Sequence, residues 1–112
     1  MKIREIKELL NAQVLADDQS LDKEIYSACG SDLMSDVLAF VKNGTVLLTG
    51  LTNPHVIRTA EVLDVSAIVF VRGKIPSQDI INMAIERSII LLTTQYTLFE
   101  ACGILYNAGL RG

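Results

Sequence analysis

The segment TVLLTGLTNPHVIRTAEVLDVSAIVFVRG, residues 45–73, decides the fold because it contains two apolar runs separated by a helical pattern. A third unit of the same kind follows, and the three units begin at Thr45, Ala67 and Ile89, each 22 residues after the last. This spacing accommodates one strand, one turn and one helix. The pattern therefore predicts a βαβαβα unit in the second part of the chain.

The three apolar runs, residues 46–48, 67–71 and 89–92, contain no alternating polar side chains. Strands of this kind are typical of parallel sheets that helices cover on both faces. The sequence thus predicts an α/β fold, a three-layer sandwich with a mostly parallel central sheet built from βα repeats. We expect residues 1–112 to form a single domain of this class.

The flanking sequence supplies further elements and helix boundaries. Apolar spacing predicts an opening helix that carries Ile3, Ile6, Leu9 and Leu10, short strands at residues 13–16 and 24–29, and a polar surface loop at residues 17–23. A helix with the apolar stripe Leu33, Met34, Val37, Leu38 and Val41 is expected to start at a Ser31 or Asp32 cap and to end at Gly44. Later helices are expected to start near Asn53-Pro54, Pro76-Ser77 and Thr97, and the last one to end at Gly109.

Composition narrows the classes of partner. Ten basic and thirteen acidic residues give a net charge of −3 with no basic run, which argues against nucleic acid. The apolar runs are far shorter than the roughly 20 residues needed to cross a bilayer, and no signal-peptide core is present, so we expect a cytoplasmic protein without membrane contact. Half of the residues are hydrophobic, more than so small an interior can bury, which favours a homodimer.

Ligands of open parallel sheets bind beyond the carboxyl ends of the strands, where the strand-to-helix loops meet. The loops that follow the three apolar runs carry glycines, hydroxyls, amides and two cations, which suit a small anion, with a nucleotide as one example. We expect the ligand-binding residues to be Thr49, Gly50, Thr52, Asn53, Arg72, Gly73, Thr94 and Tyr96. Neither a GxGxxG motif nor a P-loop is present, and the alternative is that these residues only form turns and helix caps.

Isolated reactive groups allow a weaker hypothesis of catalysis. Cys29 precedes a predicted helix start and His55 follows one, but neither has a partner base or acid nearby in the sequence. Asp32 and Asp36 are four residues apart, a spacing that places two carboxylates on one helix face, where they could share a proton or bind a metal. The alternative interpretation is that one aspartate caps the helix and the other is solvated. With only Cys29, Cys102 and a single histidine, the sequence predicts reduced thiols, no metal site and no cofactor.

The last predicted helix has apolar residues at helical spacing. Leu98, Phe99, Leu105 and Tyr106 are interpreted as core or as the seam of a dimer, and not as a cofactor site. Tyr96 differs from them because it lies in the loop at the predicted binding edge.

Three loop sequences resemble those of the DRTGG domain family, and the resemblance covers almost the whole chain. The shared features are βα units that end in Leu48-Thr49-Gly50, in residues 72–76 (RGKIP) and in residues 91–94 (LLTT). At the positions of the family's name-giving motif this chain has residues 51–53 (LTN) and Arg72-Gly73. Members of the family resemble the amino-terminal domain of bifunctional HPr kinase and accompany CBS domains in some pyrophosphatases and a catalytic domain in some phosphotransacetylases.

The resemblance implies a regulatory role and dimerisation, and it implies no kinase activity, because the catalytic domain of that kinase lies outside the matched portion. We therefore expect a non-enzymatic regulatory or ligand-binding module, with a homodimer and a partner enzyme as its protein contacts. The alternative is a pure interaction domain without a ligand. A small enzyme that uses Cys29 or His55 is the third hypothesis.

Overall fold

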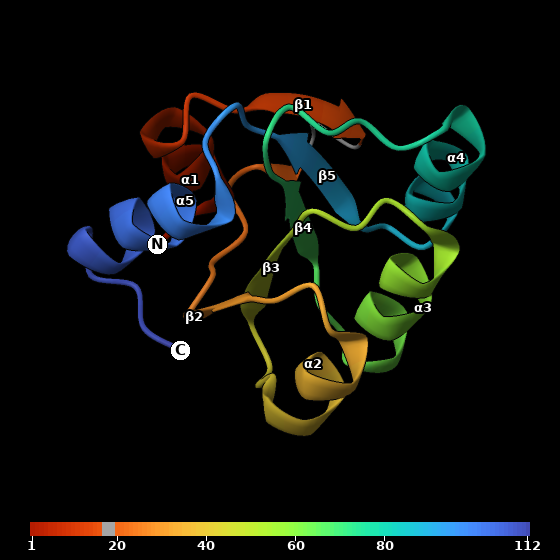
Figure 1. The fold of residues 1–112 in the computed structure, drawn as a ribbon, viewed down its shortest axis with the longest axis horizontal. Coiled ribbons are helices and arrows are strands. Elements are labelled where there is room, and N and C mark those ends of the chain that lie inside the picture. Colours follow the sequence, from red (N-terminus) through yellow and green to blue (C-terminus); the bar gives the residue numbers. More distant parts are fainter. Residues whose placement is uncertain (17–19) are drawn as a thin grey trace.

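The computed structural model describes residues 1–16 and 20–112, and from Ser27 onward strands and helices alternate along the chain (Figure 1). The elements are α1 (Ile3–Leu9), β1 (Gln13–Ala16), β2 (Ser27–Gly30), α2 (Met34–Phe40), β3 (Thr45–Thr49), α3 (Pro54–Val62), β4 (Ala67–Phe70), α4 (Gln78–Glu86), β5 (Ile90–Thr93) and α5 (Leu98–Asn107). The predicted α/β class and the three repeated βα units are confirmed.

The five strands form one sheet in the order β1-β5-β4-β3-β2. Strands β2, β3, β4 and β5 run parallel to one another, and β1 runs antiparallel to β5 at the edge of the sheet. Thr49 pairs with Phe70 and Phe70 with Thr93, so the carboxyl ends of β3, β4 and β5 are level with one another. The loops that leave these strands therefore start from the same edge of the sheet.

Helices cover both faces of the sheet, α1 and α5 on one side and α2, α3 and α4 on the other (Figure 1). Side chains of one strand alternate between the two cores: Val46 and Leu48 of β3 pack with α1 and α5, and Leu47 packs with α2, α3 and α4. All three are fully buried. This double coverage explains why the strands carry no polar alternation, and it confirms the three-layer sandwich.

The chain before β2 differs from the prediction because it bonds to segments other than β3. The strand expected at residues 24–29 begins only at Ser27. Glu24 forms an isolated bridge with Lys2 beside α1, and the N–H groups of Tyr26 and Ser27 both donate to the carbonyl of Gly44. The predicted loop at residues 17–23 lies partly outside the described residues; within it, the buried Leu21 accepts a hydrogen bond from the Arg4 N–H through its carbonyl.

Helix α2 is shorter than predicted, and its cap was assigned wrongly. Leu33 is the N-cap residue and no side chain caps it, while Ser31 Oγ accepts a hydrogen bond from the Leu33 N–H. The helix ends at Phe40, and Val41 is already extended. Gly44 adopts a left-handed φ of 74° in the turn into β3, not at the helix end. Leu33 and Leu38 are exposed, so the predicted apolar stripe is buried only in part.

The other helix boundaries follow the sequence signals more closely. Thr97 Oγ1 accepts a hydrogen bond from the Glu100 N–H at the start of α5, and Gly109 has the left-handed φ of 108° expected after its end. Asn53 is the N-cap residue of α3 and Pro54 follows it, but the Asn53 side chain makes no cap hydrogen bond. The predicted capping amide is therefore wrong, although the helix starts where expected.

Candidate functional site

The loops after β3, β4 and β5 are joined to one another by backbone hydrogen bonds at the carboxyl edge of the sheet. The Val71 N–H donates to the Thr49 carbonyl, the Arg72 N–H to the Tyr96 carbonyl and the Gly73 N–H to the Thr94 carbonyl. Each loop is thus held by its neighbour. All of these residues except Val71 are predicted site residues, and the structure brings them together along one edge of the sheet.

Arg72 has an unusual backbone conformation at this edge. Its φ is 57°, in the left-handed region that costs an L-residue roughly 1–2 kcal/mol, and Gly73 next to it has a φ of 67°. The side chain is exposed and forms no ion pair with any residue in ranges 1–16 and 20–112. The guanidinium lies against Gly50, because a methyl group placed on Gly50 would be 2.9 Å from Arg72 Nη2.

Asp32 reaches Gly50 from the opposite side. Its Oδ1 accepts hydrogen bonds from the Gly50 N–H at 2.7 Å and from Thr49 Oγ1 at 2.9 Å. Because β3 lies between β2 and β4, the residue after β2 and the residue after β4 converge on the glycine that follows β3. The Gly50 N–H and the Thr49 hydroxyl, which the sequence suggested as ligand donors, are therefore already paired within the chain.

This position of Asp32 is the feature that sequence reasoning missed. The spacing of Asp32 and Asp36 suggested two carboxylates on one helix face, but α2 begins at Met34 and Asp32 lies outside it. Only Asp36 is in the helix, in its first turn. No cluster of three or more metal-ligating side chains occurs in the part of the chain that the structure describes.

The rest of the β3–α3 loop is more open. Thr52 is half-buried, and Asn53 and His55 are exposed. Within the described ranges, His55 makes no hydrogen bond to a carboxylate that could orient its ring for acid–base chemistry.

The two cysteines lie in environments that oppose a nucleophilic role. Burial raises the pKa of the Cys29 thiol, and the negative charge of Asp36 raises it further. Burial also raises the pKa of Cys102, with a smaller contribution from Cys29. A raised pKa keeps a thiol protonated near neutral pH, whereas a reactive cysteine needs the thiolate.

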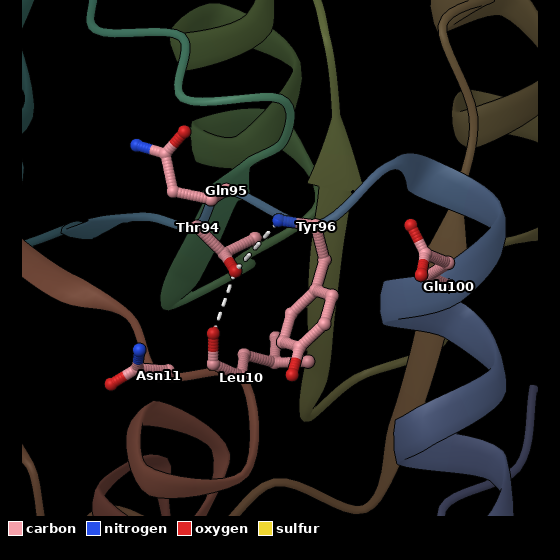
Figure 2. A pocket seen from close by; sticks show the side chains of 6 residues that line it. All are labelled: Leu10, Asn11, Thr94, Gln95, Tyr96 and Glu100. Atoms are coloured by element: carbon pink, nitrogen blue, oxygen red, sulfur yellow. Dashed lines mark hydrogen bonds between the residues drawn. The ribbon is translucent and has the colours of Figure 1, made fainter.

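A cavity of about 150 Å³ lies beside this edge, between the β5–α5 loop and the end of α1 (Figure 2). It is lined by Leu10, Asn11, Thr94, Gln95, Tyr96 and Glu100. Of the predicted site residues only Thr94 and Tyr96 line it. The hydroxyl of Thr94 donates to the Leu10 carbonyl at 2.6 Å and accepts from the Tyr96 N–H at 3.3 Å, so it is used within the chain.

Among the described residues, no helix is both long and apolar enough to cross a membrane. No protein-family model matches the chain, and no curated protein matches it significantly.

Among solved structures, the chain is similar to the CBS and DRTGG domains of the regulatory region of Clostridium perfringens pyrophosphatase, whose structure contains the activator diadenosine tetraphosphate. The TM-score is 0.79 at 19% sequence identity, over 93% of this chain and 45% of that one. This chain therefore spans less than half the length of the structure that it matches. The likeness agrees with the loop sequences described above and with the βα repeats of the sheet. The chain accordingly has a DRTGG-like α/β fold.

Proposed function

We propose that this chain is a regulatory module that binds a small anion at the carboxyl edge of its sheet and catalyses no reaction itself. The observation that carries the proposal is Arg72, whose exposed guanidinium lies beside Gly50 on a residue with a left-handed backbone. A glycine would adopt that conformation without strain. An arginine there places a permanent positive charge with a planar set of donors where three loops meet.

The anion is expected on the solvent side of Arg72. Asp32 already accepts from the Gly50 N–H, so an anion against that backbone would displace a carboxylate or be repelled by it. The outer face of the guanidinium remains available for a bidentate contact. The regulatory nature of the similar pyrophosphatase region, which was solved with a nucleotide activator, supports a regulatory role and a phosphate-bearing ligand.

The experiment that tests this function uses inorganic pyrophosphate as a probe in isothermal titration calorimetry, with the variant Gly50→Ala. A methyl group at Gly50 lies 2.9 Å from Arg72 Nη2 and only in ordinary contact with Asp32, so it moves the flexible guanidinium and little else. We expect affinity to fall by about five-fold or more. Stability should change by less than about 1 kcal/mol, because the guanidinium can swing away.

Gly112→Ala is the matched control, because its methyl group would make only ordinary contact, at 3.6 Å, with the Ala28 carbonyl oxygen. It adds the same group outside the loops that follow β3, β4 and β5, and it should leave both binding and stability unchanged. The proposed anion site is wrong if the wild-type chain does not bind pyrophosphate at millimolar concentration. It is also wrong if the Gly50→Ala variant binds pyrophosphate as tightly as the wild type.

Self-association through α5 is a second candidate function, favoured by the exposure of two aromatic side chains. Of the apolar residues on this helix, Leu105 is buried, whereas Phe99 is 88% exposed and Tyr106 is also exposed. Phe99 and Tyr106 lie two turns apart on one face, with the unobstructed Gly103 between them. Such a face allows close approach of a second copy of the helix.

We expect the wild-type chain to sediment as a dimer at micromolar concentration and Phe99→Ser to raise the dimer dissociation constant by about ten-fold or more. Phe40→Ser is the control, because Phe40 is 75% exposed on α2, which packs on the opposite face of the sheet. A monomeric wild type in sedimentation equilibrium would contradict the dimer. A dimer that binds no anion would instead favour the pure interaction domain.

A further inference from the structure

The cavity between α1 and the β5–α5 loop has a different chemistry from the Arg72 edge. Among the described residues, Glu100 is the only charged one that lines it, and one of its oxygens, Oε1, accepts a hydrogen bond from Thr97 Oγ1. Asn11 contributes an amide group, which both donates and accepts hydrogen bonds. With a carboxylate and no cation on its walls, this cavity disfavours an anion and favours a neutral group that carries N–H donors.

The size and the apolar walls indicate a flat ring. A cavity of about 150 Å³ is large enough to hold a benzene-sized ring. Figure 2 shows the Tyr96 ring pointing from its loop toward Leu10, and both side chains belong to the same apolar cluster. An aromatic face beside an aliphatic side chain suits the stacking of a heteroaromatic ring, with polar groups at its edge.

This cavity is directly connected to the loop of Arg72. The Arg72 N–H donates to the carbonyl of Tyr96, and the Gly73 N–H donates to the carbonyl of Thr94, both at 2.8 Å. The Gln95 side chain lies against Gly73, where an added methyl group would be 2.8 Å from Gln95 Oε1. The cavity for a neutral ring and the exposed cation therefore lie on adjoining loops.

We propose that the cavity binds the amino-bearing base of a nucleotide whose phosphate contacts Arg72. The inference rests on the anion-binding function proposed above and names its ligand class. The base stacks on Tyr96, and its exocyclic amino group donates to the carboxylate of Glu100 or to the amide oxygen of Asn11. The phosphate stays outside the cavity, where Glu100 does not oppose it.

The test is calorimetric titration of the full chain with adenosine, purine riboside, AMP and inorganic pyrophosphate. Adenosine should bind to the wild type at least about ten-fold more tightly than purine riboside, which lacks the amino group and carries no other N–H on its ring. Tyr96→Ala should weaken the binding of adenosine and AMP by about ten-fold or more and leave the binding of pyrophosphate unchanged, because only the ring contact is lost. Arg72→Ala should do the reverse, weakening AMP and pyrophosphate while adenosine binds as before.

Asn11→Gly is the second variant, in case Tyr96→Ala unfolds. Asn11 has a φ of 47°, which glycine adopts freely, so this change removes the amide and keeps the backbone. The Asn11→Gly variant should bind adenosine several-fold more weakly than the wild type.

The outcomes separate the two proposals. If pyrophosphate binds and adenosine does not, or if adenosine and purine riboside bind equally, the base site is overturned and the anion site stands. If adenosine binds in a manner that depends on Tyr96 while pyrophosphate does not bind, the anion function is overturned and the base site stands.

Discussion

Arg72→Gly is expected to stabilise the protein slightly while it weakens pyrophosphate binding by about 10- to 100-fold. The gain arises because glycine adopts a φ near 57° without the strain that an arginine bears there. Glycine also adds flexibility to the unfolded chain, so the net increase in unfolding free energy should be only about 0.5 kcal/mol. The loss of affinity follows from removing a charge-assisted contact worth roughly 1.5–3 kcal/mol.

Stability is measured by urea denaturation and affinity by calorimetry on the same samples. Ser88→Gly is the matched control, because Ser88 has a φ of 55° and lies before β5, at the opposite edge of the sheet from Arg72. It should give a similar change in stability and no change in affinity. An Arg72→Gly variant that binds pyrophosphate like the wild type would show that the left-handed arginine has no role in binding.

The parts of the fold that the sequence predicted well depend on local signals. The central strands are continuous apolar runs, and the start of α5 and the turn after it carry the threonine and glycine that such ends require. These patterns act over a few residues and are visible without tertiary information. The loop sequences that resemble the DRTGG family independently predicted the same fold, and the structural likeness agrees with that prediction.

The predictions around α2 failed because tertiary contacts outweighed local preference. Asp32 is a residue type that often caps helices, but here its carboxylate accepts hydrogen bonds from the Gly50 N–H and the Thr49 hydroxyl of the neighbouring strand and loop. It therefore does not cap α2. Gly44 has the chemistry of a helix stop, yet its carbonyl bonds to the start of β2 and its left-handed turn leads into β3. Such competition depends on which strands are neighbours, and no window of sequence contains that information.

The candidate site likewise has one part that the sequence could predict and one part that depends on tertiary contacts. That the loops after β3, β4 and β5 share an edge could be predicted from their parallel order. The cavity could not, because one wall comes from the end of α1 and the other from the β5–α5 loop, with Leu10 and Thr94 separated by 84 positions. The one sequence signal was Asn11, a residue type that tolerates the left-handed conformation it adopts there.

Thr94→Val should lower the free energy of unfolding by about 2–4 kcal/mol, a large part of the total for a domain of this size. Thr94 is 2% exposed, and its hydroxyl pairs with the Leu10 carbonyl and the Tyr96 N–H. Valine has nearly the same shape and leaves both of these backbone groups without that partner. Urea denaturation measures the loss, and Thr94→Ser, which keeps the hydroxyl, should cost about 1 kcal/mol or less for one methyl group.

The same two hydrogen bonds tie Leu10 and Tyr96, which both line the cavity, to Thr94, so Thr94→Val should also weaken adenosine binding several-fold in the fraction that remains folded. Pyrophosphate binding should be retained, because the Thr94 hydroxyl bonds to Leu10 and Tyr96 and makes no contact with the Arg72 guanidinium. A Thr94→Val protein within about 0.5 kcal/mol of the wild type would mean that the hydroxyl does not anchor α1 to this loop. Equal loss of adenosine and pyrophosphate binding would mean that the cavity and the Arg72 edge are one site whose parts cannot be separated.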